Sequence, residues 1–320
     1  MAEPGGRRPI LLLVNPVAGG KPGAPTPSEP PLEPEQLRDR LAAGGLDVSL
    51  RVLEADDDPG RLAADGVADD RDLVVAGGDG TVRPVAAALV GTDATLGVVA
   101  RGSWNNIANG WGLPTEERDA VDAIIAGTPR QVDVGLAWHP AVDSSEGAPD
   151  DATIFFEAAG VGLDAAGFGA ASVGVRYGVW RALRAGWRAL RRRRTKMILD
   201  VDGRKLRTSA PAVTACNGPH YGFGITLVPD ADPADGQLDL VVFSGMSTLD
   251  TIRHYLAVAR NRPRREARVR HMLARRISVS GRWRTLPAHA DGESIGVTPV
   301  AFAVRPSALR IFTPGGSQPG

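Results

Sequence analysis

The residues with the clearest chemistry form a glycine-rich run that directly follows the apolar stretch 73–76. The run is Gly77-Gly78-Asp79-Gly80-Thr81. Its glycines permit positive φ and let a bulky anion approach the backbone, and a helix expected over about 82–89 would direct free N–H groups at that anion. Asp79 would repel phosphate unless Mg²⁺ lay between them. The run therefore predicts a nucleoside triphosphate site, although a plain turn between strand and helix is the alternative.

Two other loops contain residues suited to anions or cations. Asn15-Pro16 ends an apolar run, and Gly19-Gly20-Lys21 follows, which places a second glycine loop where ligands bind in parallel sheets. Farther along, Asp230, Asp232 and Asp235 alternate with free carbonyl groups, a pattern that suits a hard cation such as Mg²⁺ or Ca²⁺. A solvated acidic turn is the alternative for this loop.

The elements that must position these loops change in kind along the chain. Up to about residue 133, short apolar runs alternate with stretches of helical spacing, the pattern of a parallel sheet with helices on both faces. The expected strands are 10–14, 48–53, 73–76 and 96–99, and the expected helices are 37–43, 62–67 and 85–89. Beyond this point, apolar runs separated by turns predict a second, mainly β domain. Its expected strands are 132–136, 153–157, 197–201, 212–216, 238–243, 277–280 and 301–304.

The composition is that of a globular protein, with 43% hydrophobic and 23% charged residues. A net charge of zero hides an asymmetry: residues 1–175 carry 12 Lys and Arg against 27 Asp and Glu, whereas residues 176–320 carry 25 against 10. The basic half suggests an anionic partner surface. Cys216 is the only cysteine, so no intrachain disulfide can form, and no apolar stretch approaches the roughly 20 residues that span a bilayer. We expect a cytoplasmic protein.

Seven short elements, taken together and in order, resemble the diacylglycerol kinase catalytic family, which includes bacterial lipid kinases and sphingosine kinases. The resemblance extends from about residue 10 to residue 312. The elements are Asn15-Pro16 with Gly19-Gly20-Lys21, the run 77–81, Gly102-Ser103-Trp104-Asn105-Asn106-Ile107-Ala108 with Leu113-Pro114, Val132-Asp133-Val134-Gly135, Asn217-Gly218, Asp235-Gly236-Gln237-Leu238 and Asp291-Gly292-Glu293.

The resemblance implies a fold and an activity. The fold would be an α/β nucleotide-binding domain of the NAD-kinase kind over residues 1–135, with a last strand returning to it at about 305–320. Residues 136–304 would form a mainly β sandwich domain for the lipid substrate. The activity would be transfer of the γ-phosphoryl group of ATP to a lipid hydroxyl of the diacylglycerol or sphingoid-base type.

The resemblance also implies roles for individual residues. Glu293 would accept the proton of the attacking hydroxyl, with Asp291 as the alternative; without the family, Asp-Gly is simply a hairpin turn. Asp79 and Asp133 would belong to a Mg²⁺ network, and a structural Mg²⁺ would bind the Asp235 side chain with carbonyl groups at Asp232 and Gln237. The nucleotide would contact Asn15, Lys21, Gly77, Gly78, Asp79, Gly80, Thr81, Gly102, Ser103 and Asn105.

A membrane is the expected partner. On a helix over 173–196, Trp180 and Trp187 would share an apolar face with arginines along its flank, as in helices that lie on anionic phospholipids. The alternative is a helix packed on the β domain with a solvated basic face. A second basic stretch, 260–276, would extend the same surface. Nucleic acid is disfavoured because no recognised binding module accompanies the basic residues. We therefore expect a peripheral protein at the inner membrane face.

Several residues depart from the family pattern. Arg83-Pro84 replaces the Asn-Glu that usually follows the glycine run, with the proline expected in the first helical turn, where it costs little. Asn106 and Asn109 replace a potential metal ligand and a potential phosphate-binding arginine. Two other hypotheses therefore stand beside the lipid kinase: an NAD kinase-like enzyme, and a degenerate kinase scaffold that binds nucleotide or lipid without turnover. The sequence leaves the acceptor lipid and a homodimer open.

Overall fold

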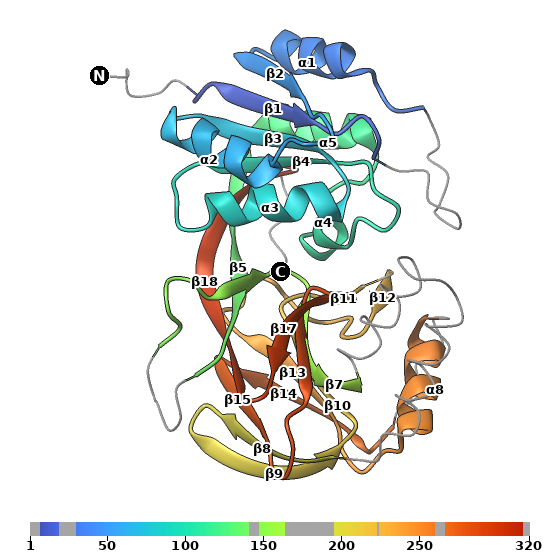
Figure 1. Ribbon diagram of the computed structural model, residues 1–320. Helices are drawn as coiled ribbons and strands as arrows, with labels where there is room; N and C mark the ends of the chain where they lie inside the picture. Colours follow the sequence, from blue (N-terminus) through green and yellow to red (C-terminus); the bar gives the residue numbers. More distant parts are fainter. Residues whose placement is uncertain are drawn as a thin grey trace. The chain divides into compact units, whose positions relative to one another are not determined.

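The computed structural model describes residues 7–18, 30–140, 147–163, 195–222, 224–259 and 266–315 (Figure 1). The chain divides into two compact units. Unit 1 comprises Met1–Val132 and Ser307–Gly320, and unit 2 comprises Asp133–Pro306. Lys21, residues 173–194 of the helix expected over 173–196, and residues 260–265 of the second basic stretch lie outside the described residues. Residues 195 and 196 belong to the strand Thr195–Val201, so the helix expectation is wrong for this end of the segment.

Unit 1 contains a parallel sheet in the order β2-β1-β3-β4, and the end of β18 lies beside β4. The strands β3 and β4 are buried along their whole length, which is why their sequences read as continuous apolar runs. Residues 10–14 pair in register with residues 72–76 of β3. The strands are β1 (Ile10–Val14), β2 (Val48–Val52), β3 (Asp72–Gly77), β4 (Thr95–Ala100) and β18 (Val300–Thr313).

Helices cover both faces of this sheet (Figure 1). Leu41 of α1 and Ile124 of α5 pack in one core cluster with Leu12 and Val74. Gly66 of α2 lies on the opposite face, and a Cβ there would lie 3.0 Å from Leu11 Cδ2, because neighbouring strand residues point to opposite faces. The helices are α1 (Pro34–Ala43), α2 (Pro59–Ala68), α3 (Asp79–Leu89), α4 (Asn106–Gly110) and α5 (Glu117–Ala126).

Unit 2 is a β sandwich. One antiparallel sheet has the order β14-β13-β10-β7-β16-β17; in the other, β15 pairs with β18 and β8, β8 with β9, and β5 with β18 and β6. Val213 and Leu240 of the first sheet pack against Leu199 and Phe302 of the second in one buried core. The remaining elements are β5 (Thr128–Trp138), β6 (Thr153–Phe155), β7 (Ala158–Gly162), β8 (Thr195–Val201), β9 (Arg204–Ala210), β10 (Ala212–Cys216), β11 (His220–Tyr221), β12 (Ile225–Thr226), β13 (Leu238–Phe243), α8 (Thr248–Ala259), β14 (Val269–Ala274), β15 (Arg276–Gly281), β16 (Pro287–Ala290) and β17 (Glu293–Val297).

The expected fold class, an α/β unit followed by a β sandwich, is confirmed. One local expectation is wrong: α3 begins at Asp79, so Pro84 lies inside the helix and not in its first turn. A proline there removes one helical hydrogen bond and crowds the carbonyl group four residues earlier. That carbonyl group belongs to Gly80. Within the described residues, no helix is long and apolar enough to cross a bilayer.

Asp72 provides a test of buried charge in unit 1. It is 9% exposed, its Oδ1 accepts the Thr95 N–H at 2.7 Å, and burial raises the pKa of its carboxyl group. Folding raises the pKa of this carboxyl group above its ordinary value of 3.8. The buried charge therefore lowers the stability of the folded protein as the pH rises from 3.8 through the raised pKa.

The substitution Asp72→Asn keeps a hydrogen-bond acceptor for Thr95 and removes the charge. We expect its urea midpoint to exceed that of the wild type at pH 7, with a difference that shrinks towards pH 4; a constant difference would contradict this.

Candidate nucleotide and phosphoryl-transfer site

The glycine run of unit 1 forms the turn between β3 and α3. Gly78 is the N-cap of α3 and accepts the Thr81 N–H through its carbonyl group at 2.8 Å. The expectation of positive φ is wrong, because none of the three glycines has it. Two of these positions need glycine because neighbouring atoms leave no room for a side chain. A Cβ on Gly77 would lie 2.8 Å from Thr81 Cβ, and a Cβ on Gly78 would lie 2.9 Å from Gly102 Cα.

A second loop follows β4 and packs on the first. Asn105 has left-handed backbone angles (φ 50°, ψ 42°), and its Oδ1 accepts the Gly102 N–H at 2.7 Å. A Cβ on Gly102 would lie 2.6 Å from Gly78 Cα and 2.7 Å from that oxygen. The structure therefore brings together Gly78, Asp79, Gly102 and Asn105 from two motifs that are separate in the sequence.

Asp79 ties these loops together. Its two carboxylate oxygens accept the backbone N–H groups of Asn106 and Ile107, each at 3.1 Å, at the start of α4. The sequence predicted Asp79 as a nucleotide and Mg²⁺ contact, whereas in the structure its carboxylate also satisfies amides that a helix start leaves unpaired. The contact at position 106 uses the backbone, so it does not depend on whether that residue is Asn or Asp.

Asn15 connects the end of β1 to the same turn. Its Nδ2 donates to Thr81 Oγ1 at 2.9 Å, and its backbone N–H donates to the Ala76 carbonyl group at 2.9 Å. Thr81 is 5% exposed. Asn15 and Thr81 thus belong to one hydrogen-bonded assembly with the glycine turn.

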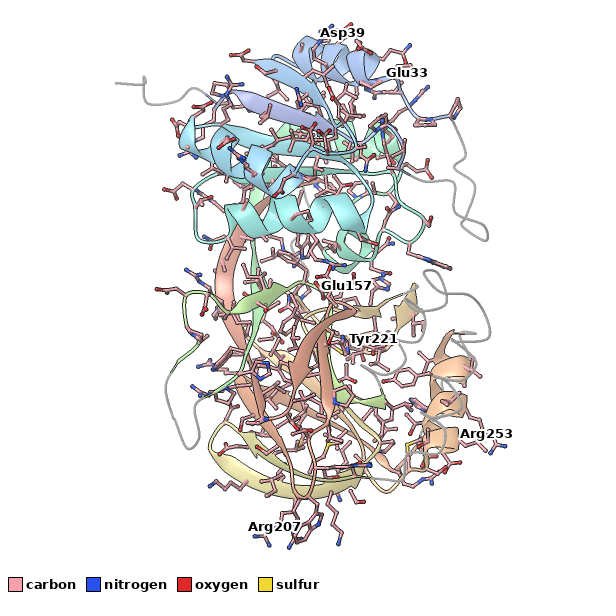
Figure 2. The ribbon with its side chains drawn as sticks, in the orientation of Figure 1. Glu33, Asp39, Glu157, Arg207, Tyr221 and Arg253 are labelled. Carbon is pink, nitrogen blue, oxygen red and sulfur yellow. The ribbon has the colours of Figure 1, made fainter. Side chains whose placement is uncertain are left out.

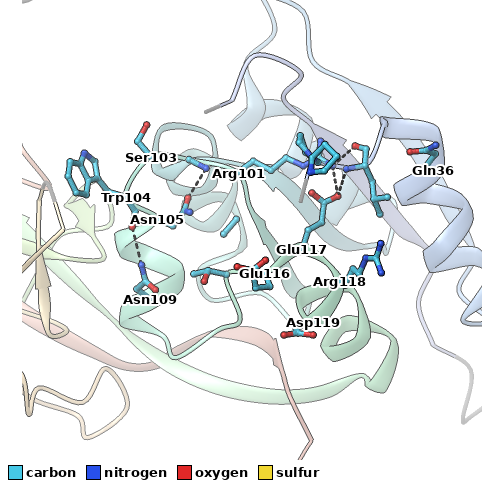
Figure 3. A pocket seen from close by; sticks show the side chains of 16 residues that line it. Gln36, Arg101, Ser103, Trp104, Asn105, Asn109, Glu116, Glu117, Arg118 and Asp119 are labelled. Carbon is cyan, nitrogen blue, oxygen red and sulfur yellow. Dashed lines mark hydrogen bonds and ion pairs between the residues drawn. The ribbon is translucent and has the colours of Figure 1, made fainter. Parts of the chain in front are cut away.

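A pocket of about 760 Å³ opens beside the second loop (Figure 3). Ser103 and Trp104 lie on one side of it, and Gln36 of α1 lies on the other. Trp104 is 42% exposed, and its carbonyl group accepts a hydrogen bond from Asn109 Nδ2 at 3.0 Å. The pocket is lined by residues 30–32, Gln36, 100–105, Asn109 and 115–119. Its size and mixed polarity suit a small ligand.

In unit 2, Asp291 and Glu293 occupy the hairpin between β16 and β17. Asp291 and Gly292 have φ of 45° and 80°, as two-residue hairpin turns require. The Asp291 carboxylate accepts three backbone N–H groups, from Phe156 at 2.8 Å, Glu157 at 2.9 Å and Ala158 at 3.1 Å. With three amide donors, Asp291 is an anchor for the β6–β7 segment. Glu293 is exposed at the first position of β17.

Asn217 and Asp133 link this hairpin to the acidic loop. Asn217 donates from its backbone N–H to the Glu157 carbonyl group at 2.9 Å and from Nδ2 to the Asp133 carbonyl group at 3.0 Å. Asp133 is 1% exposed, and its Oδ2 accepts the Gly236 N–H at 2.6 Å. A continuous set of hydrogen bonds therefore joins the loop at Gly236 to the segment that Asp291 anchors.

The acidic loop holds its carboxylates near one another. Asp232 accepts the Ala234 N–H at 3.0 Å, and Asp235 accepts the Gln237 N–H at 2.8 Å. Burial raises the pKa of Asp235, and the nearby charges of Asp239, Asp232 and Asp133 raise it further. Among the described residues, no group of three or more His, Cys, Asp or Glu side chains could hold a metal ion. A cation here would therefore need backbone carbonyl groups as well, a hard oxygen set that fits Mg²⁺ or Ca²⁺.

Sequence reasoning missed two buried residues. Glu157 is 8% exposed, and its Oε2 accepts the Gly222 N–H at 3.1 Å, next to Tyr221 (Figure 2). Arg101 forms an ion pair with Glu117, Nη2 to Oε1, at 2.6 Å. Neither residue belongs to a recognisable local motif. The sequence offered one indication, which is that Arg101 directly precedes Gly102 of the second glycine loop.

The fold and loops define a class of protein: kinases that combine an α/β domain with a β-sandwich domain. Two family models match the chain, "Diacylglycerol kinase catalytic domain" over residues 9–137 and "YegS C-terminal NAD kinase beta sandwich-like domain" over residues 161–313. The chain belongs to the diacylglycerol kinase catalytic family and is a kinase.

Relatives agree with this assignment. The chain is 27% identical over 286 residues to "Diacylglycerol kinase" of Mycobacterium tuberculosis (strain H37Rv), covering 86% of this chain and 87% of the relative. It is 27% identical over 299 residues to "Probable lipid kinase YegS-like" of Pseudomonas aeruginosa (strain PAO1), covering 88% and 91%. Against "Uncharacterized protein sll0036" of Synechocystis, it is 29% identical over 76% of this chain but spans only 54% of that protein.

A solved structure supports the fold. The crystal structure of a putative diacylglycerol kinase from Bacillus anthracis (strain Sterne) superposes with a TM-score of 0.71 at 20% identity, covering 96% of this chain and 98% of that one.

The contact between the loops can be tested with two Gly→Ala variants. Gly102→Ala would force a Cβ against the Gly78 backbone, so we expect it to destabilise the protein by about 1–3 kcal/mol. Gly80→Ala is the matched control: apart from its chain neighbours and its own helix backbone, no atom lies within 4 Å of the added Cβ, and replacing glycine by alanine in a helix stabilises by about 0.4–1 kcal/mol. Urea unfolding measures both. Equal unfolding free energies for the two variants would contradict the backbone contact.

Proposed function

We propose that this kinase transfers the γ-phosphoryl group of ATP to a lipid hydroxyl of the diacylglycerol or sphingoid-base type. The main support is the docking of two glycine loops at the carboxyl ends of β3 and β4, where the start of α3 offers backbone N–H groups to an anion. The names of the relatives, diacylglycerol kinase and probable lipid kinase, support a lipid as the acceptor.

Unit 1 would bind and orient the nucleotide. The amides of the glycine turn and the hydroxyl group of Ser103 would contact phosphate oxygens, while Asn15 holds Thr81 in place. Bound Mg²⁺ would neutralise charge on the transferred phosphoryl group, and Asp79 would hold it with oxygen lone pairs that the two amides leave unused. Lys21 would add a positive charge; it lies outside the described residues.

Unit 2 would supply the proton acceptor. In the reaction, a bond forms between the lipid hydroxyl oxygen and the γ-phosphorus, the bond from that phosphorus to the β–γ bridging oxygen breaks, and the hydroxyl proton passes to a base. We assign this role to Glu293, which is exposed, in preference to Asp291, which is bound to three amides. Asp291 would act by fixing the hairpin that carries Glu293.

The membrane part of the proposal rests on the sequence. We propose that the protein works at the cytoplasmic membrane face and contacts anionic phospholipids through the Trp- and Arg-containing segment 173–196. Residues 173–194 of it lie outside the described part of the chain. A lipid acceptor requires such access in any case, because its hydroxyl group sits at the membrane surface.

The activity is tested by incubating the protein with γ-labelled ATP, Mg²⁺ and extracted membrane lipids, and separately with NAD. We expect a labelled lipid. Glu293→Gln should lower kcat by about 10²-fold or more without changing the melting temperature, because the side chain is exposed. Glu35→Gln is the matched control, because it makes the same Glu-to-Gln change at an exposed position of α1.

Three other outcomes would change the assigned base or the assigned function. Full activity of the Glu293→Gln variant would exclude this residue as the base while leaving the class of enzyme intact. Labelled NAD would favour the NAD kinase-like hypothesis. Binding of ATP with no labelled product would favour the degenerate scaffold.

A structural cation in the acidic loop is a separate prediction. In nucleotide-free protein treated with EDTA, adding Mg²⁺ or Ca²⁺ at about ten times its dissociation constant should stabilise the fold by about 1.4 kcal/mol. Asp235→Asn should remove this gain, whereas Asp230→Asn, at an exposed position of the same loop, should retain it. Because the pKa of Asp235 is raised, protons should compete with the cation at higher pH than for an ordinary aspartate. No gain for the wild type would contradict the site.

A further inference from the structure

Arg101 makes buried contacts that link three parts of unit 1. Its Nη2 donates to the Leu32 carbonyl group at 2.7 Å and to Glu117 Oε1 at 2.6 Å. Its side chain is 9% exposed and that of Glu117 is 14% exposed. The backbone N–H of Arg101 donates to the Gly77 carbonyl group at 2.9 Å. One residue is thus bound to the glycine turn, to the segment before α1 and to the first residue of α5.

Glu117 completes the link from the other side. Its Oε1 also accepts the Leu32 N–H at 3.2 Å, so both backbone polar groups of Leu32 are held by the ion pair. Leu32 packs against the core cluster of α1 and α5. The dashed contacts in Figure 3 show this arrangement at the edge of the pocket. The pair therefore fixes the chain on both sides of the pocket, at Leu32 and at the loop that starts with Gly102.

Stability alone does not explain this pair. Arg101 Nε is buried and has no hydrogen-bond partner among the described residues, which costs free energy. Well-packed apolar residues often replace a buried ion pair without loss of stability. What apolar residues could not do is hold the Leu32 carbonyl and N–H groups in a defined position.

We propose that Arg101 and Glu117 are positioning residues for the nucleotide. They act through the second loop, keeping residues 102–105 at the distance from the glycine turn that a bound triphosphate requires. Arg101 would act through the loop and not as a phosphate ligand, because its Nη2 is bound to Glu117 and Leu32 and its Nε is buried. This inference rests on the proposed ATP-dependent function.

The test compares Arg101→Met with Arg40→Met. Arg40 forms an exposed ion pair with Asp122 at 3.0 Å, which also joins α1 to α5 but lies on the surface. We expect Arg101→Met to raise the KM for ATP about tenfold, as loss of a charged hydrogen bond predicts, with kcat and the KM for lipid within about twofold of wild type. Arg40→Met should leave all three unchanged.

The double variant Arg101→Met with Glu117→Met separates positioning from stability. It should melt at or above the wild-type temperature and still show the raised KM for ATP. Wild-type KM in Arg101→Met, an equal rise in Arg40→Met, or a normal KM in the double variant would each overturn the inference.

Hydrogen exchange in nucleotide-free protein distinguishes this inference from the proposed function. Arg101→Met should speed exchange of the amides at 102–107, and Arg40→Met should not. Wild-type protein that binds no ATP, together with this exchange difference, would contradict the ATP-dependent function while leaving the anchoring intact. Unchanged exchange in a protein that does bind ATP would contradict the anchoring alone.

Discussion

The contact between Gly78 and Gly102 is the constraint on which the site of unit 1 depends. Strands β3 and β4 are hydrogen-bonded neighbours, so their carboxyl ends lie about 4.8 Å apart and the loops that leave them start side by side. Such loops can remain packed only where side chains are absent, because a Cβ at either glycine would overlap the other backbone. Asp79 can reach the amides of α4 because the two loops lie this close.

Unit 2 uses carboxylates in a related way. Asp291 binds three amides and Asp133 binds the Gly236 amide, and both therefore serve as fixed connections between strands and loops. A carboxylate that accepts three amide donors, as Asp291 does, is poorly suited to accept a proton as well. Glu293 lies two positions after Asp291 in the sequence, and Asp235, whose carboxylate accepts the Gln237 N–H, lies near Asp133. Asp291 thus has a structural role that a motif such as Asp-Gly-Glu does not reveal by itself.

The fold could be predicted from the sequence because strands that are buried on both faces have continuous apolar sequences. Residues 73–76 and 96–99 read as unbroken apolar runs because β3 and β4 are buried on both faces. The glycine turn was predicted for two reasons, positive φ and close approach to the backbone, and the structure contradicts the first. Composition cannot distinguish a glycine needed for positive φ from one needed for close approach. The pairs Arg101–Glu117 and Asn217–Asp133 could not be predicted, since they join residues 16 and 84 positions apart and follow no local period.

The contacts of Asn106 and Asn109 show a structural role for two residues that depart from the family pattern. Asn106 gives its backbone N–H to Asp79, a contact that any residue except proline could make, and Asn109 holds the Trp104 carbonyl group through its amide side chain. Both residues therefore help to order the second loop. These contacts suit a loop that binds a ligand, which an active kinase and a scaffold that binds without turnover have in common. The arguments for reduced turnover are therefore chemical: position 106 lacks an acidic side chain, and position 109 lacks an arginine.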